Sequence, residues 1–280
     1  MQLIDTHQHL IYRDRIGYGW TARIPALSAG DFTTGDYAAL TDGLGVAGSV
    51  FMETGVDASD YRAEARMVAE LIAAPGSTIL GQIASCRPEE DGFAGWLDES
   101  AALGVVGYRR ILHEIDDELS QGGAFRRNVR EIGARGLTFD LCFLARQLGI
   151  AQDLAAACPD TQLILDHCGV PDIAGADFAS WAPAMTRMAA MPNVVCKLSG
   201  ILAYCAPGTA GMAAIRPYVD HVLEAFGPDR ILWGSDWPVV DLGGGLPGWI
   251  GITREILAGL SDGEAALIAS GTARRVYRLP

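Results

Sequence analysis

Short apolar runs alternate with amphipathic stretches along the whole chain. Eight short runs have the length and composition of buried strands. They are Gln2–Thr6, Val46–Met52, Thr78–Ala84, Val105–Arg109, Leu137–Cys142, Gln162–Asp166, Val194–Leu198 and Arg230–Trp233. Between them, Tyr61–Ala73, Phe125–Ala134 and Pro217–Phe226 place apolar residues at i, i+3 and i+4, as helices do. The unbroken alternation predicts one α/β domain over residues 1–280, a (β/α)8 TIM barrel.

Two long segments without periodicity interrupt this pattern. Ile11–Asp36 follows the first predicted strand, and Val239–Ile250 follows the eighth. Because both come after the carboxyl ends of strands, we expect both to lie over the mouth of the barrel. The run Gly243-Gly244-Gly245 predicts either a mobile lid or an ordinary glycine-rich turn.

Composition narrows the possible partners and the compartment. The chain has 280 residues and a formal net charge of −13, which argues against nucleic acid as a partner. No apolar stretch of about 18 residues is present, so we expect no membrane span. No basic region followed by an apolar segment opens the chain, so we expect no signal peptide and a cytoplasmic location.

The cysteines fit the same compartment. None of them forms a CxxC pair, and several lie inside apolar runs, where a thiol acts as a small hydrophobe. They are Cys86, Cys142, Cys158, Cys168, Cys196 and Cys205. We therefore expect reduced core cysteines.

Ionisable residues gather where the predicted strands end. His7 and His9 follow the first strand, and their spacing turns both imidazoles to the same side. The other strand ends carry Glu53, Arg109, Arg110, His113, Asp166, His167, Lys197, Ser199, Ser235 and Asp236. Taken singly, Arg110 could form a rim ion pair, Lys197 could lie on the surface and Asp166 could cap a loop. Taken together, they predict a catalytic mouth at the carboxyl end of the barrel.

Several motifs carry a resemblance to a known family. They are Asp5-Thr6-His7-Gln8-His9, Gly107-Tyr108-Arg109-Arg110, Leu165-Asp166-His167-Cys168-Gly169, Cys196-Lys197-Leu198-Ser199-Gly200, Trp233-Gly234-Ser235-Asp236-Trp237-Pro238 and Ala273-Arg274-Arg275-Val276-Tyr277. This set resembles the amidohydrolase superfamily over the full chain. More narrowly, it is similar to the branch of sugar-lactone and pyrone-lactone hydrolases, which includes L-fuconolactonases and 2-pyrone-4,6-dicarboxylate hydrolases.

The resemblance implies a role for each matching residue. Asp236 would be the general base that activates water, and His167 would polarise the carbonyl or help to hold an ion. His7 and His9 would be metal ligands in metal-using members or hydrogen-bond donors to the carbonyl in metal-free ones. The implied substrate-binding residues are Arg109, Arg110, Lys197 and Glu53.

Two departures from the family pattern bear on these roles. Binuclear members of the superfamily bridge two metals through a modified lysine at the end of strand four, where this chain has Arg109 and Arg110. One Zn²⁺, or another divalent ion, on His7, His9 and Asp236 is therefore expected, and a metal-independent site is the alternative. Residues 201–205 hold no acidic side chain of the kind common in sugar-lactone members, which counts against a sugar substrate.

The sequence thus predicts a hydrolase that opens a small lactone with water activated by Asp236. The lactone would be a sugar-acid lactone or a carboxylated pyrone or muconolactone. A metal-dependent decarboxylase of a small aromatic or unsaturated acid is the alternative function, and a non-catalytic binding barrel is a third. Since Arg109 and Arg110 are neighbours on one strand, we expect one to face the pocket and the other the outer helices. The sequence leaves the oligomeric state open.

Overall fold

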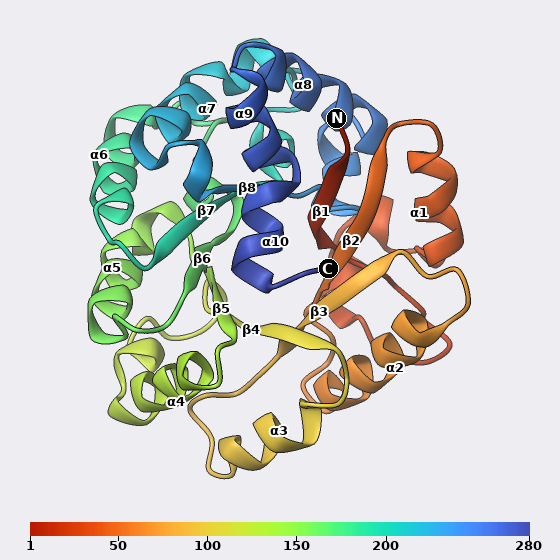
Figure 1. Ribbon diagram of the computed structural model, residues 1–280, viewed down its shortest axis with the longest axis vertical. Helices are drawn as coiled ribbons and strands as arrows, with labels where there is room; N and C mark the ends of the chain where they lie inside the picture. The colour runs from red at the N-terminus through yellow and green to blue at the C-terminus, as the bar shows by residue number, and fades with distance from the viewer.

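A closed barrel of eight parallel strands forms the centre of the computed structural model, which describes all 280 residues (Figure 1). The strands follow one another around the barrel in chain order. They are β1 (Leu3–Gln8), β2 (Val46–Met52), β3 (Ile79–Ser85), β4 (Val105–Ile111), β5 (Thr138–Cys142), β6 (Leu163–Leu165), β7 (Val194–Leu198) and β8 (Ile231–Trp233). The predicted barrel is confirmed, and β2 and β7 have the predicted bounds.

The barrel closes where the end of β1 pairs with the segment that follows β8. The Asp236 N–H donates to the His7 carbonyl and the His9 N–H donates to the Trp237 carbonyl, each at 2.8 Å. Because every strand then has two neighbours, the sheet has no open edge.

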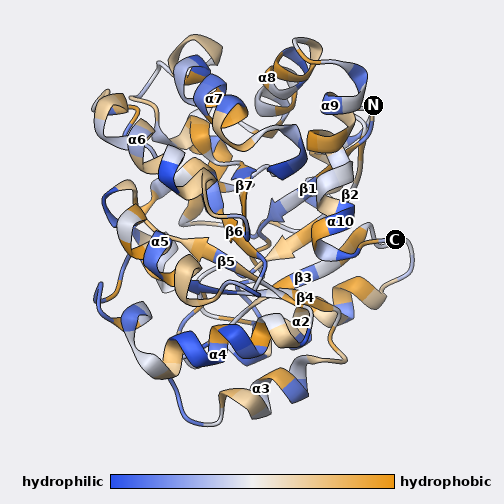
Figure 2. Ribbon diagram, turned by 60° about the vertical axis from the view of Figure 1, so that its left-hand side comes forward, coloured by the Kyte–Doolittle hydropathy of each residue, from blue (hydrophilic) through white to orange (hydrophobic).

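Helices surround the barrel and bury one face each. They are α1 (Thr34–Thr41), α2 (Tyr61–Ala73), α3 (Phe93–Ser100), α4 (Gly123–Ala134), α5 (Leu148–Ala157), α6 (Phe178–Ala189), α7 (Met212–Phe226), α8 (Leu246–Ala258), α9 (Asp262–Ala266) and α10 (Thr272–Tyr277). On α4, Phe125, Val129 and Ile132 are buried, and Figure 2 shows hydrophobic and hydrophilic residues alternating along this helix. Helix α7 begins at Met212, earlier than the predicted start at Pro217. Ile215 already packs into the core, and Pro217 lies inside the helix.

The last helix closes the amino-terminal end of the barrel. Figure 1 shows α10 lying across that end, close to the carboxyl terminus. Val276 and Tyr277 of α10 belong to an apolar cluster with strand residues inside the barrel. Those strand residues are Ile4, Val50, Met52, Ile83, Ile164, Val195 and Leu232. The lower interior is therefore a packed core, which leaves the other end for a site.

The two predicted inserts have regular structure. Short 3₁₀ helices, Gly19–Arg23 and Pro25–Leu27, occupy the first, and a 3₁₀ helix, Val239–Gly243, opens the second before α8. A Cβ on Gly243 would lie 2.3 Å from the Leu202 backbone, while Gly244 and Gly245 have φ of 109° and 83°. Close packing and turn geometry thus account for the glycine run without a hinge. None of the helices is long and apolar enough to cross a bilayer.

Candidate active site

The main cavity lies over the carboxyl ends of the strands and has a volume of about 330 Å³. Its floor is polar and contains His9, Arg109, His167 and Asp236. Arg109 lies on β4, and the other three side chains come from the segments that directly follow β1, β6 and β8. The structure therefore brings together, at the predicted mouth, residues that lie far apart in the chain.

Strand β1 and the residue just after it supply two imidazoles, His7 and His9. The β1–β2 register shifts between Asp5 and Gln8, and the Asp5 carboxylate accepts the His7 N–H inside this irregular stretch. The ring centroids of His7 and His9 lie 4.9 Å apart. His9 Nδ1 is 2.9 Å from the Met52 carbonyl oxygen. Because a carbonyl only accepts, His9 Nδ1 carries the hydrogen, and Nε2 is the ring nitrogen that faces Asp236.

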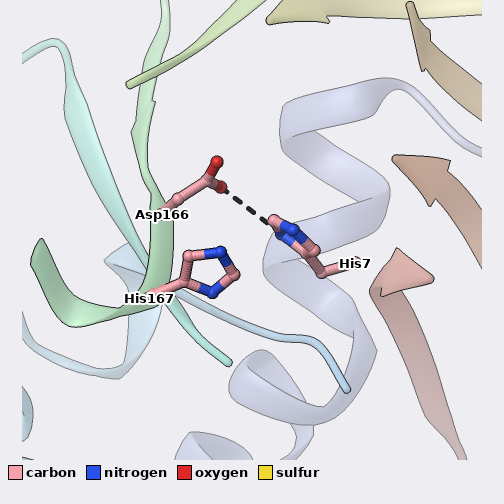
Figure 3. A group of neighbouring side chains, drawn as sticks. All are labelled: His7, Asp166 and His167. Carbon is pink, nitrogen blue, oxygen red and sulfur yellow. Dashed lines mark ion pairs between the residues drawn. The ribbon is translucent and has the colours of Figure 1, made fainter. Parts of the chain in front are cut away.

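The segment after β6 turns in the left-handed sense. His167, Cys168, Gly169 and Val170 have φ of 52°, 53°, 68° and 50°. A non-glycine residue in this region costs on the order of 1–2 kcal/mol, most for a β-branched one such as Val170. The turn places the His167 ring 4.3 Å from that of His7, centroid to centroid. Figure 3 shows both rings beside Asp166, whose Oδ1 lies 3.4 Å from His7 Nδ1.

Asp236 lies at the centre of the three histidines. Its backbone is also left-handed, with φ of 61°. The Oδ1 atom lies 3.3 Å from His9 Nε2 and 3.7 Å from His7 Nε2, and Oδ2 lies 3.9 Å from His167 Nδ1. The same His167 nitrogen is 2.9 Å from Ser199 Oγ, which orients the ring. A carboxylate in this position can accept a proton from a molecule held in the cavity.

The neighbouring arginines of β4 have different surroundings. Arg109 is 3% exposed; its Nε donates to Glu53 Oε1 at 2.7 Å and its Nη2 to the Glu53 carbonyl at 2.6 Å. Its Nη1 lies 3.2 Å from His7 Nε2 and 3.3 Å from Asp166 Oδ2. Arg110 lies outside the main cavity and pairs with Glu89. One arginine of the pair thus faces the cavity and the other does not.

Two other predicted substrate-binding residues do not line the main cavity. Lys197 has no exposed surface, and its Nζ lies 2.5 Å from Asp140 Oδ2 and 3.2 Å from Asp166 Oδ1. Glu53 is 1% exposed and accepts from Arg109 and from the Gly55 N–H. Both side chains lie beneath the floor, where they hold other residues in place.

Burial and neighbouring charges determine which of these site side chains are ionised. Burial and the nearby His167 hold the pKa of His7 well below its usual value, so its ring is neutral. Burial alone would raise the pKa of the Asp166 carboxyl, but Lys197 and His7 outweigh it and hold that pKa well below the usual value. Burial also lowers the pKa of His167 and raises that of the Tyr204 hydroxyl. The floor therefore combines neutral imidazoles with an ionised Asp166.

The residues present fit a single divalent ion. Nε2 of His7, Nε2 of His9 and Asp236 Oδ1 converge, and both histidines turn Nδ1 toward an oxygen acceptor, as metal-ligating histidines do. A second group, His7, Asp166 and His167, is also close enough. In that group the Asp166 carboxylate already pairs with Lys197 and Arg109. His7, His9 and Asp236 are therefore the better donor set. His7 is common to both groups, which favours one ion.

Sequence reasoning missed three residues of this region. Asp140 is a charged residue inside the buried strand β5, and Lys197 is a residue of opposite charge inside the buried strand β7. Two opposite charges in two apolar runs could have indicated a buried ion pair. Trp20 lines the main cavity from the first insert, and Tyr204 lines it from the segment after β7. No spacing rule singles out an aromatic side chain in a loop.

Fold and site define a (β/α)8-barrel enzyme with a histidine–aspartate centre at the carboxyl ends of its strands. Residues 4–279 match the model of the amidohydrolase family. The chain belongs to the amidohydrolase family and is a hydrolase.

Two curated relatives show the range of this similarity. An L-fucono-1,5-lactonase from Burkholderia multivorans is 30% identical, with 99% of this chain and 96% of that protein covered. A 2-pyrone-4,6-dicarboxylate hydrolase from Comamonas testosteroni is 27% identical over 75% of this chain and 68% of that protein.

Solved structures agree with this placement. A crystal structure of an amidohydrolase from Burkholderia multivorans with bound zinc has a TM-score of 0.89 and 27% identity, and covers both chains completely. A 5-carboxyvanillate decarboxylase from Sphingomonas paucimobilis has a TM-score of 0.69 over 100% of this chain and 99% of that one, but only 18% identity, and shows the fold alone.

Proposed function

We propose that the protein hydrolyses a small lactone with water activated by Asp236. The observation that carries this proposal is the Asp236 carboxylate, which lines the main cavity between His9 and His167. The similarity to L-fucono-1,5-lactonase along nearly the full length supports an ester ring as the target. The proposed site is Asp236 with His7, His9 and His167, held by Arg109, Glu53 and Lys197.

The reaction begins with water held against Asp236. The carboxylate takes one proton while the water oxygen adds to the lactone carbonyl carbon, which forms a tetrahedral oxyanion. The His167 ring and the Tyr204 hydroxyl face the cavity where that charge develops. The bond between the carbonyl carbon and the ring oxygen then breaks, and the leaving oxygen takes the proton from Asp236. The product is the open hydroxy acid.

Other residues position this machinery. Arg109 joins Glu53, Asp166 and His7 in one buried array, so the imidazole of His7 is fixed from two sides. His7, His9 and Asp236 would hold one Zn²⁺ or another divalent ion, as the zinc-containing relative suggests. Such an ion supplies Lewis-acid polarisation of the carbonyl and a lower pKa for water.

The decarboxylase alternative has no specific support. No arginine of the cavity is free to bind a substrate carboxylate, because every guanidinium nitrogen of Arg109 already has a partner on Glu53, Asp166 or His7.

Hydrolysis of a panel of small lactones, followed by acid release at constant pH, tests the proposal. We expect turnover of at least one lactone by the wild-type protein and none above background by Asp236→Asn. If no lactone is opened, or if Asp236→Asn is as active as the wild type, the proposal is wrong. Zinc content is measured on the same preparations.

A further inference from the structure

The side walls of the main cavity are apolar, in contrast to its floor. Six half-buried apolar side chains line them from the segments that follow the strands and from the end of β4. They are Trp20, Ile24, Ile111, Leu144, Val170 and Val239. A substrate in this cavity therefore rests its reacting carbonyl on polar groups and its remaining atoms on hydrocarbon.

The polar groups of the walls are few, and most have partners inside the protein. Trp20 Nε1 donates to the Thr54 carbonyl at 2.8 Å, and the Thr54 hydroxyl donates to the Leu10 carbonyl at 3.3 Å. His113 Nδ1 lies 3.3 Å from Cys142 Sγ. A sugar lactone presents hydroxyls on most of its ring carbons, and each needs a partner when it leaves water. Beyond Trp20 and Thr54, the walls offer only the Tyr204 hydroxyl and the neighbouring His113 and Glu114, which lie 3.9 Å apart, so most hydroxyls of a sugar ring would lack a partner there.

The walls of the cavity also lack a free cationic side chain. Arg109, the one arginine or lysine that lines it, is fully engaged with Glu53 and Asp166. Arg110 lines a separate, smaller cavity and pairs there with Glu89. The other charged side chains that line the main cavity, Asp236 and Glu114, are acidic, so a carboxylate on the substrate's substituent would find no cationic side chain among the walls.

We propose that the substrate is an uncharged lactone with an apolar substituent on its ring, such as an alkyl chain. The lactone ester lies against Asp236 and His167, and the substituent packs on Ile111 and Leu144. This inference rests on the proposed lactone hydrolysis and assigns the wall residues as determinants of specificity. Alkyl substituents gain affinity in such a cavity because each buried methylene leaves water.

Four probe lactones separate the possibilities. δ-Valerolactone is the unsubstituted ring, δ-octalactone adds a propyl group, L-fucono-1,5-lactone is polyhydroxylated and 2-pyrone-4,6-dicarboxylate is charged. We expect kcat/KM for δ-octalactone to exceed that for δ-valerolactone by about tenfold or more, since each buried methylene is worth roughly fourfold. We also expect it to exceed kcat/KM for the two polar probes.

Variants of the walls test the assignment of residues. Leu144→Asn and Ile111→Asn should each lower the ratio of kcat/KM for δ-octalactone over δ-valerolactone by about fivefold. The ratio is measured within one preparation, so partial misfolding cancels. Leu40→Asn, at an exposed position on α1, is the matched control and should leave the ratio unchanged.

The outcomes separate this inference from the proposal beneath it. If L-fucono-1,5-lactone or 2-pyrone-4,6-dicarboxylate has the highest kcat/KM, the apolar assignment is wrong while lactone hydrolysis stands. An unchanged ratio in both wall variants also overturns it. If the wild-type protein opens none of the four probes, lactone hydrolysis fails, and the substrate assignment fails with it.

Discussion

The floor and the walls of the main cavity are built in different ways. Floor residues lie on or directly after strands, are almost fully buried, and hold one another through several contacts each, as Arg109 does. Wall residues such as Trp20 and Leu144 come from loops and are only half-buried. The contrast shows that the barrel itself fixes the chemistry, while the loops determine what fits. Changes in the floor should therefore affect turnover and stability together, and changes in the walls should affect selectivity.

The largest effect is expected from Asp236→Asn, which keeps the shape of the floor but removes its base. We expect kcat on any lactone that the wild type opens to fall by about 10²–10⁴. Circular dichroism should show an unchanged fold. Asp241→Asn, at an exposed aspartate of the neighbouring 3₁₀ helix, is the control and should keep nearly full activity. A kcat above a tenth of the wild-type value would exclude Asp236 as the base.

Arg109→Met and Arg110→Met compare two neighbours on β4. Loss of Arg109 leaves Glu53 buried without its cation and takes one of two cations from Asp166, so we expect the free energy of unfolding to fall by about 3–5 kcal/mol. Arg110→Met breaks only the partly exposed pair with Glu89 and should cost less than about 1 kcal/mol. Urea denaturation measures both. Equal losses would mean that the two arginines have equivalent environments, contrary to the structure.

Zinc uptake distinguishes the proposed metal ligands from the other residues that line the cavity. We expect uptake to saturate at one equivalent per chain, because both possible donor sets share His7. His9→Ala should abolish uptake, whereas His113→Ala changes a cavity histidine outside both sets and should not. Elemental analysis after dialysis against zinc measures the stoichiometry. Two equivalents per chain would contradict the single site.

The last prediction concerns the support beneath the floor. Glu64 is buried on α2 and accepts the Thr54 N–H at 2.9 Å. Burial, together with the nearby Glu53, raises the pKa of Glu64 to about 8, from 4.5 when free. Between these two pH values the folded state binds more protons than the unfolded state. Glu64 therefore stabilises the fold less and less as pH rises through this window.

Glu64→Gln removes this titration. Relative to the wild type, the variant should gain stability between pH 5 and pH 8, by at most about 1.4 kcal/mol per pH unit. Urea midpoints at several pH values measure the trend. Glu70→Gln on the same helix removes an exposed carboxylate and should show no such trend. A relative loss of stability with rising pH would contradict the direction of the Glu64 shift.

The barrel was predictable from the sequence because eight short apolar runs alternate with stretches of helical periodicity. The bounds of β2 and β7 agree with prediction, and the others differ by a residue or two. The location of the floor was predictable for a related reason. Parallel strands bring their carboxyl ends to one edge, so polar residues that follow successive strands must meet there.

The walls and the inner ion pairs were not predictable in the same way. Lys197 was expected to bind substrate, yet it is sealed against Asp140 and Asp166. Strand alternation gives the face on which a side chain lies but not its depth in the barrel. Trp20 lies in a segment without periodicity, so its contact with the cavity depends on the tertiary path of the loop.

Closure of the barrel has a consequence for how the protein is made. The Asp5 carboxylate accepts the Ser235 N–H across 230 residues of chain, and the backbone of His7 is held by Asp236. During synthesis from the amino terminus, His7 and His9 leave the ribosome long before these partners exist. Contacts of such wide sequence separation form late, after the intervening units have folded. The histidine–aspartate centre is therefore one of the last features of the molecule to form, and a chain truncated before β8 has no site.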